Sequence, residues 1–246
     1  METGKWKDIW EKRTDRFRKI DMTDKMAVFL ELKRIDGFDV VGGIGLDALI
    51  KQSADILTRL SKHFEIKSIF DVGCGCGANL YLFRDEGLRI GGMDYSTAQI
   101  KIARKIFCDN EVGEKNKTVE ELICGEAASL PTDVKYDALI SNSVFSYFSG
   151  EEYANIVLDK MFKKSNVSIG LIDIHDIDKK QAFINFRRET VENYDERYKD
   201  LHKFFYSRDF FKKWAEKNNL EIEFYDSNVE GYWNKEFVFD VYFYKK

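Results

Sequence analysis

The 246-residue sequence contains a single proline, three histidines and four cysteines, and each scarcity excludes a class of protein. With Pro131 alone, the chain has no proline-rich linker, and it shows no repeats or low-complexity segments. The cysteines form no Cys-x-x-Cys pair and have no nearby histidine, so we expect reduced, structural thiols and no metal site. No apolar run approaches the roughly 18 residues that a membrane-spanning helix requires.

The chain also has no excess of positive charge, because its formal net charge is -4. A nucleic-acid substrate usually calls for a basic face, whereas the basic pairs here are short and interleaved with acids, as on solvated helix faces. The N-terminus lacks a basic and then apolar leader. We therefore expect a cytoplasmic protein with neither a nucleic-acid nor a membrane partner.

The most informative segment is Ile69–Phe83, where an apolar and aromatic run ends in an acid, passes three glycines at alternate positions and opens into an amphipathic stretch. This order predicts a strand, a tight turn and a helix. Because glycine has no Cβ, such a turn can lie against a ligand that also faces the positive end of the helix. The segment is typical of a nucleotide-binding unit.

Two types of ligand use such a turn. A dinucleotide site, as in a nicotinamide-dependent oxidoreductase, needs Gly-x-Gly-x-x-Gly or Ala, which Gly73, Gly75 and Ala78 satisfy loosely. The alternative is Asp-x-Gly-x-Gly-x-Gly, which Asp71, Gly73, Gly75 and Gly77 match at every position. The chain therefore resembles the class I S-adenosylmethionine (SAM) dependent methyltransferases. The resemblance implies that Asp71 reaches the ligand ammonium and that the glycines make room for its carboxylate and sugar.

The next motif is Leu88–Tyr95, which predicts a second strand that ends in Asp94. An acid there can bind both ribose hydroxyls, although a dehydrogenase would place one similarly. Ser96 is a typical N-cap for a helix that reaches about Phe107. This places Tyr95 beside the ligand, where an adenine could stack.

Two further segments fall where the family's later motifs would be. The stretch Cys124–Pro131 resembles the segment after the third strand, and the resemblance assigns the adenine contacts to the Glu126 carboxylate and the Ala127 amide. The stretch Tyr136–Phe148 predicts a fourth strand followed by a polar turn, which resembles the part that holds the methionine moiety of SAM. Asn142 and Ser143 lie at the carboxyl end of that strand, where open α/β sheets bind ligands.

Three more strands, at Asn166–Ile172, Leu220–Tyr225 and Phe237–Tyr244, complete the count. The resemblance implies an α/β, Rossmann-like three-layer sandwich with a seven-stranded sheet whose last strand is antiparallel. We expect residues 64–246 to form this methyltransferase domain as one structural unit. Residues 1–63 would form a helical leader that serves as a lid.

Substrate contacts in this family come from additions to the sheet, and the leader is the first of these. Trp6 and Trp10 lie in it, ahead of a helical pattern from about Thr23 to Arg34. Two roles are open for these tryptophans: they form part of a lid over SAM, or they only pack on the flank of the sheet.

The second addition follows the fifth strand. His175, just past the expected strand end, could accept a proton from a substrate hydroxyl because its ordinary pKa lies near neutrality. Alternatively it only hydrogen-bonds Asp176 or a substrate oxygen. Asp173, Asp176 and Asp178 could suggest a metal, but they cannot all face one point if the strand continues. A polar helical insert should then run to about Phe205.

The third addition begins at His202 and contains Tyr206, which resembles the aromatic that many small-molecule methyltransferases place over the acceptor. Ser207 is a typical N-cap for a helix to about Lys217. A loop before the last strand adds aromatic rings that line the pocket or form an oligomer contact. The residues expected to contact the acceptor are Trp10, Tyr147, His175, Tyr206 and Tyr232.

These features predict an enzyme in which an acceptor oxygen or nitrogen attacks the sulfonium methyl in line, leaving S-adenosylhomocysteine. The polar insert and aromatic rim suit a small polar metabolite, and His175 favours O-methylation of a hydroxyl, as on a sugar. The adenine and cytosine amino-methylases are excluded because their Asn or Asp followed by two prolines is missing. Three alternatives remain: N-methylation of a small amine, a catalytically silent SAM-binding subunit, and an NAD(P)-dependent oxidoreductase. The oligomeric state stays open.

Overall fold

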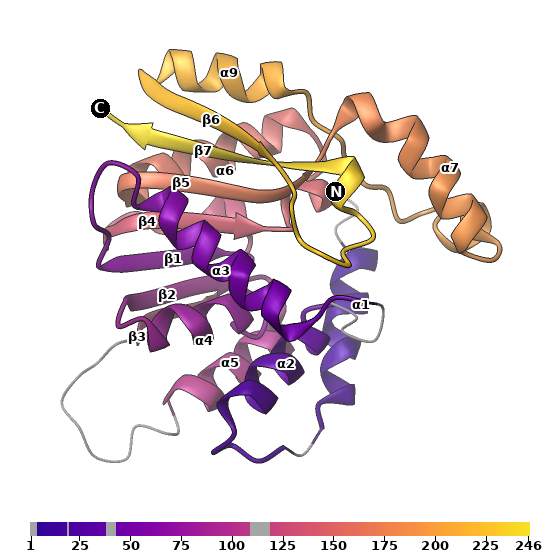
Figure 1. Ribbon diagram of the computed structural model, residues 1–246, viewed down its shortest axis with the longest axis horizontal. Helices are drawn as coiled ribbons and strands as arrows, with labels where there is room; N and C mark the ends of the chain where they lie inside the picture. The colour runs from indigo at the N-terminus through magenta and orange to yellow at the C-terminus, as the bar shows by residue number, and fades with distance from the viewer. Residues whose placement is uncertain (1–3, 19, 38–42, 109–118) are drawn as a thin grey trace.

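The computed structural model describes residues 4–18, 20–37, 43–108 and 119–246. Seven strands form a single sheet in the order β3-β2-β1-β4-β5-β7-β6 (Figure 1). The first five strands are parallel, and β7 lies antiparallel between β5 and β6. The strands are β1 Ser68–Val72, β2 Arg89–Asp94, β3 Val119–Cys124, β4 Tyr136–Asn142, β5 Ser165–His175, β6 Leu220–Asp226 and β7 Val238–Lys245.

The predicted sheet is confirmed in its strand count and in its reversed last strand. The largest difference is at the end of β5, which continues three residues beyond the expected end at Ile172, to His175. Its pairing with β7 is interrupted by a register shift between Leu171 and Ile174. Asp173 lies in this irregularity with a left-handed backbone, φ +63°. The regular alternation of side chains along β5 is therefore broken at Asp173.

Helices cover both faces of the sheet, which confirms the three-layer sandwich. On one face lie α3 Leu46–Leu60, α4 Ala78–Asp85 and α5 Thr97–Cys108, and on the other lie α6 Glu151–Lys164 and α9 Arg208–Lys217. Figure 1 shows α3 in front of the sheet and α6 behind it. The insert after β5 forms α7 Lys180–Thr190 and α8 Tyr194–Arg197, and α7 projects to one side of the sheet.

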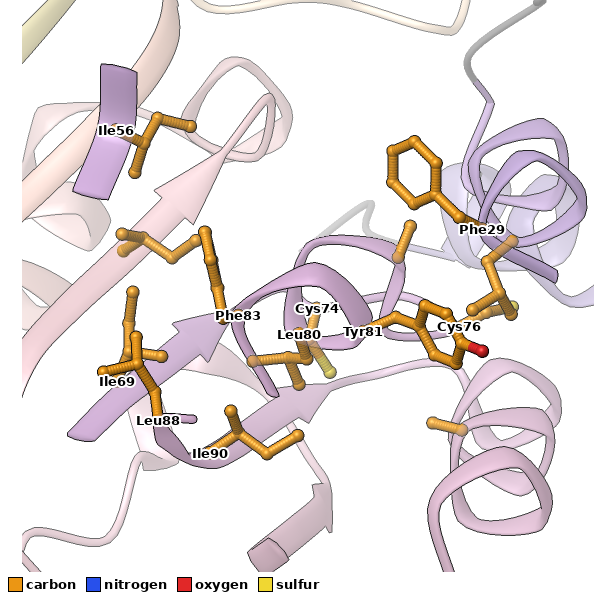
Figure 2. Close-up of a cluster of buried hydrophobic side chains, with 14 of the residues drawn as sticks. Phe29, Ile56, Ile69, Cys74, Cys76, Leu80, Tyr81, Phe83, Leu88 and Ile90 are labelled. Carbon is orange, nitrogen blue, oxygen red and sulfur yellow. The ribbon is translucent and has the colours of Figure 1, made fainter. Parts of the chain in front are cut away.

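The glycine turn is anchored in the core beneath it. Figure 2 shows Leu80 and Phe83 of α4 packed with Ile69 of β1 and Ile90 of β2. Cys74 and Cys76 are buried in the same cluster with free thiols, as expected for structural cysteines. Cys124 differs, because it is exposed, and the side chain of Cys108 lies outside those that the structure describes.

The leader contains α1 Gly4–Arg13 and α2 Lys25–Ile35, followed by α3. The predicted helix from Thr23 begins at Lys25 instead, because Asp24 is its N-cap and accepts from Met26 N and Ala27 N. Helix α3 packs on β5 and α4, so the last part of the leader belongs to the sandwich itself.

Helix α1 is fixed by charged side chains at two places. The Glu11 carboxylate accepts from Thr97 N at 2.8 Å and from Ala98 N at 3.0 Å, at the start of α5. A negative group at a helix N-terminus is stabilised by the unpaired N–H groups and by the helix dipole. Arg13 donates to Ile35 O at 3.1 Å and thereby joins α1 to the end of α2.

The predicted cap of α9 is present, since Phe210 N donates to Ser207 Oγ at 3.1 Å. We expect Ser207→Ala to lower the free energy of unfolding by about 1 kcal/mol, because one helix N–H loses its partner. Ser207→Asp supplies another acceptor and should stay close to the parent. Urea denaturation followed by circular dichroism measures both variants. Equal destabilisation in both would show that the hydroxyl is not acting as a cap.

Candidate active site

A cavity of about 1000 Å³ lies at the carboxyl ends of the parallel strands. Open α/β sheets bind their ligands at this edge, where the chain leaves successive strands in loops. The glycine turn after β1, the end of β2, the turns after β3 and β4, α1, and the loop before β7 all contribute to its wall. The segments that the sequence singled out therefore converge on one space.

The glycines of the turn are required by its backbone. Gly73, Gly75 and Gly77 have φ values of +85°, +56° and +87°, a region that other residues rarely adopt. A Cβ on Gly73 would lie 2.3 Å from a Val144 methyl, and one on Gly77 would lie 2.6 Å from the ring of Phe107. Gly73 and Gly75 line the cavity, whereas Gly77 faces α5 and begins α4.

At the end of β2, the Asp94 carboxylate faces the cavity and also orders the turn. It accepts from Gly75 N at 3.0 Å and from Ser96 N at 2.8 Å. Burial raises the pKa of Asp94 to about 6. Tyr95 lines the cavity beside it, and the predicted N-cap is present, since Gln99 N donates to Ser96 Oγ at 3.2 Å.

The residues predicted after β3 and β4 also line the cavity. The Glu126 carboxylate accepts from Tyr153 OH at 3.2 Å, and Ala127 begins a short 3-10 helix next to it. Asn142 and Ser143 follow at the end of β4, where Ser143 has a left-handed backbone with φ +59°. Of the ten predicted cofactor residues, Asp71 and Gly77 are the two outside the lining.

Asp71 does not line the cavity, although the sequence predicted that it reaches the ammonium group of the ligand. It is 1% exposed, lies beneath the turn, and accepts from Asn79 Nδ2 at 3.4 Å. Asn79 and Lys33 line the cavity in its place, with Lys33 Nζ donating to Asn79 Oδ1 at 2.7 Å. The acid therefore lies behind the residues that a ligand would touch. Burial raises the pKa of Asp71 to about 7 and lowers that of Lys33 to about 8.

The sequence did not indicate Asp36, which the leader places on the glycine turn. Its carboxylate accepts from Cys76 N at 2.7 Å and from Ala78 N at 3.4 Å, at the N-terminus of α4. A Cβ on Gly75 would lie 2.3 Å from the Asp36 carboxylate oxygen. Burial raises the pKa of Asp36 to about 7. Lys33 and Asp36 come from a helix end with no recognisable motif, so only the fold brings them here.

A polar cluster forms the far end of the cavity around Asp173. The Asp173 carboxylate accepts from Ser143 Oγ at 2.6 Å, from Tyr232 OH at 3.0 Å and from Asn234 Nδ2 at 3.3 Å. Burial raises the pKa of Asp173. Asp173 and Ser143 both hold left-handed backbones, and such strain persists only where the surroundings impose it. The two left-handed residues therefore lie together at this end of the cavity, joined by the hydrogen bond from Ser143 Oγ to Asp173.

His175 does not line the cavity, which corrects its expected place beside the methyl group. It is 1% exposed and packs between the rings of Phe183 and Phe205, at centroid distances of 5.0 and 5.1 Å. Its Nε2 lies 3.2 Å from Asn234 Nδ2, so Asn234 stands between it and the cavity. Burial lowers the pKa of His175 well below its ordinary value. The cause is that β5 continues to His175 with its alternation broken at Asp173.

Tyr206 is a second correction. Its side chain is fully buried among aromatic rings that include Phe145 and Phe211, and its hydroxyl donates to Phe145 O at 3.0 Å. An isolated parallel β-bridge pairs the backbone of Tyr206 with that of Asp176, directly after the end of β5. The side chain therefore fills the core instead of covering an acceptor.

Trp10, Tyr147 and Tyr232 do line the cavity, as the sequence predicted for acceptor contacts. The rings of Trp6 and Trp10 meet Tyr147 edge to face at centroid distances of 4.7 and 5.8 Å. Trp6 Nε1 also donates to His202 O at 3.2 Å. The two tryptophans thus pack on the protein and border the cavity at once.

The insert after β5 contributes three lining residues to which the sequence assigned no role: Asp200, His202 and Lys203. Lys203 Nζ lies 5.1 Å from the centroid of the Tyr147 ring. Burial lowers the pKa of Lys203 to about 8. A polar run carries no sign of which side chain turns inward, so this contribution could be found only in the structure.

Within residues 4–18, 20–37, 43–108 and 119–246, no group of three or more His, Cys, Asp or Glu side chains could hold a metal ion. In the same described ranges, no helix is both long enough and apolar enough to cross a membrane.

Residues 70–166 match a family model described as a methyltransferase domain. The matched segment includes the glycine turn, Asp94, Glu126 and Ser143, which the fold gathers around the cavity. This match, together with the fold, supports the resemblance to the class I SAM-dependent methyltransferases. A malonyl-[acyl-carrier protein] O-methyltransferase from Priestia megaterium (strain DSM 319 / IMG 1521) is 28% identical over 114 residues. That alignment spans 44% of this chain and only 37% of the relative.

Two solved structures have the same fold. Magnesium protoporphyrin IX methyltransferase from Synechocystis PCC 6803 with bound SAM superposes with a TM-score of 0.62 at 12% identity, over 100% of this chain and 98% of the other. SAM-bound CalS10, an amino pentose methyltransferase from Micromonospora echinaspora involved in calicheamicin biosynthesis, gives 0.57 at 13% identity, over 79% and 91%. At these identities the likeness establishes the architecture.

The buried Asp71 carboxyl should make stability depend on pH. Because its pKa is raised from 3.8 to about 7, the folded protein holds a proton that the unfolded chain has released between these values. Ionisation of Asp71 therefore does not lower the free energy of unfolding below about pH 4, and lowers it by the full amount above about pH 7. We expect Asp71→Asn to be more stable relative to the parent at about pH 8 than at about pH 5.

Urea unfolding of both proteins at the two pH values gives the difference in the free energy of unfolding. Asp137→Asn, at a partly exposed position outside the cavity, is the matched control and should show no such pH-dependent gain. A constant difference between Asp71→Asn and the parent at both pH values would contradict the assignment.

Proposed function

We propose that the chain is an enzyme that transfers the methyl group of SAM to an oxygen atom of a small polar metabolite, with S-adenosylhomocysteine as the second product. The observation that carries this proposal is the single cavity that joins the glycine turn, Asp94 and Glu126 at one end to the strained Asp173 cluster at the other. The binding of SAM by the two structural neighbours supports the cofactor.

The residues present fit SAM by their chemistry. Gly73 and Gly75 form a cradle that a Cβ would fill, as a ligand backed closely against the chain requires. Asp94 offers cavity-facing acceptors for two ribose hydroxyls, and Glu126 offers one for the adenine amino group beside Tyr95. Asn142 and Ser143, with Lys33 and Asp36 from the leader, would hold the methionine part. SAM supplies an activated methyl group when bound.

The protein's own contribution is alignment and exclusion of water. Trp6, Trp10 and Tyr147 border the cavity as a connected aromatic wall, which fits the lid role expected of α1. The Asp173 cluster presents hydroxyl and amide groups at the far end, so a polar acceptor suits this end better than an apolar one.

The acceptor expected from the sequence was a hydroxyl, as on a sugar, and His175 was its base. With His175 behind Asn234, that base does not reach the cavity, so the support for a hydroxyl acceptor is lost while the support for a polar acceptor stands. The relative named as an O-methyltransferase favours oxygen over nitrogen. The net charge of -4 supports a small acceptor over nucleic acid, and we assign the protein to the cytoplasm.

Calorimetric titration of the protein with SAM, S-adenosylhomocysteine and NADH tests the cofactor. We expect the first two to bind and NADH to show no heat of binding. Incubation with methyl-labelled SAM and a metabolite extract then tests the transfer. Binding of NADH in place of SAM would indicate an oxidoreductase, and SAM binding with no transfer would indicate a silent subunit.

Affinity for SAM should depend on Asp94. Asp94→Ala removes the charged acceptor of two hydroxyls and should cost on the order of 2 to 3 kcal/mol, or roughly 30- to 150-fold in Kd. Asp94 also accepts from Gly75 N and Ser96 N, so thermal unfolding must accompany the titration, together with the isosteric Asp94→Asn.

The matched control is Asp85→Ala, an exposed acid at the end of α4, which should bind SAM like the parent. If a folded Asp94→Ala protein bound SAM as tightly as the parent, the ribose assignment would be wrong.

A further inference from the structure

The charged side chains that line the cavity differ between its two ends. At the end with the glycine turn, the acids Asp36, Asp94 and Glu126 outnumber the one lining cation there, Lys33. The other end holds the Lys203 ammonium together with Asp173 and Asp200. SAM carries a net positive charge, which suits the end with the glycine turn. By the same reasoning, the Lys203 ammonium suits an anionic group of a ligand.

Lys203 has room for an anionic partner. Its Nζ lies over the face of the Tyr147 ring, and among the described residues no side-chain hydrogen bond or ion pair engages it. Lys203 is partly buried and its Nζ lines the cavity, so a ligand carboxylate there would gain a charge-assisted hydrogen bond. Burial raises the pKa of Tyr147, which keeps its hydroxyl protonated as a second donor to that carboxylate.

The other charged groups near Lys203 leave this position to a ligand. Asp173 attracts the ammonium, yet both of its carboxylate oxygens already accept hydrogen bonds, from Ser143, Tyr232 and Asn234. Asp200 and His202, its neighbours along the chain, are exposed at the mouth of the cavity. Asp173 is therefore engaged by the protein, whereas Lys203 faces the space where the acceptor would lie.

The different requirements of a hydroxyl and a carboxylate for a catalytic base also favour an anionic acceptor. A hydroxyl acceptor must give up a proton, but His175 is sealed behind Asn234 and Asp173 is occupied by donors. A carboxylic acid, with an ordinary pKa near about 4, is already ionised at neutral pH and needs no base.

We propose that the acceptor is a carboxylic acid, bound as its carboxylate by Lys203 and Tyr147, and that the product is its methyl ester. This inference rests on the proposed function. In the transfer, one carboxylate oxygen forms a bond to the methyl carbon while the S–CH₃ bond breaks, and the electron pair of that bond stays on sulfur. The negative acceptor and the sulfonium become a neutral ester and a neutral thioether, and no proton is released.

The type of product tests the inference without knowledge of the natural acceptor. Methyl-labelled SAM is incubated with the enzyme and either a metabolite extract or a panel of short carboxylic acids with their matched alcohols, amides and amines. The products are then treated with alkali, which hydrolyses methyl esters to methanol but leaves methyl ethers and N-methyl groups intact. We expect label in the acids alone, released as volatile methanol. Label that resists alkali would overturn the carboxylate acceptor while leaving the proposed function in place.

Variants of Lys203 test the position of the carboxylate. With an acid that the panel identifies, Lys203→Met should lower kcat/KM by roughly 30-fold or more, chiefly through a higher acceptor KM, with the Kd for SAM unchanged. Lys203→Arg keeps a cation and should restore most of the activity. The matched control is Lys199→Met, an exposed lysine four residues earlier, which should behave like the parent.

A Lys203→Met enzyme with the parent's acceptor KM would overturn the assignment of Lys203. Two outcomes would overturn the proposed function itself. In the first, the parent protein binds no SAM. In the second, it binds SAM but labels neither the extract nor the panel.

Discussion

The site depends on one close approach, that of the backbone at residues 73–77 to the elements around it. Gly73 N and Cys74 N both donate to Met93 O, so the turn after β1 is hydrogen-bonded to the last residues of β2. Its left-handed glycines then let Val144 and Asp36 come within distances that a Cβ would forbid. The turn after β4 and the end of α2 can reach the cavity only because the glycine turn leaves them this space.

Packing acids against this turn has an electrostatic cost that the protein does not relieve internally. Burial raises the pKa values of Asp36, Asp71 and Asp94, and Lys33 is the cation that opposes the first two. Such a cluster is destabilising for the folded protein alone and favourable for a cationic ligand. Affinity at this end of the cavity and stability of the ligand-free fold therefore oppose each other.

The parts of the site that the sequence predicted are those encoded locally. Asp94, Glu126 and Ser143 each lie within two residues of a strand end, and the strands are recognisable by composition and alternation. The misplaced residues depend on tertiary features. His175 was displaced by the break in β5 at Asp173, and Tyr206 by its bridge to Asp176. Neither feature leaves a mark in the sequence nearby.

The residues that were not foreseen came from segments without a motif. Lys33 and Asp36 reach the cavity because α2 ends over α4, and Lys203 because the insert after β5 folds back beside Tyr147. Polar residues on a helix end or in a connecting segment look the same whether they face water or a ligand. Their position is decided by long-range packing.

The contacts of α1 have a consequence for the order of assembly. Glu11 accepts from the start of α5, Trp10 contacts Tyr147, and Trp6 donates to the carbonyl of His202. One short helix therefore contacts segments as far as 196 residues away in the sequence. During synthesis α1 leaves the ribosome long before its last partner exists. The contact between Trp6 and His202 therefore cannot form until the insert after β5 has been synthesised. A nascent chain that ends before this insert contains the glycine turn but lacks Asp200, His202 and Lys203, which line the cavity.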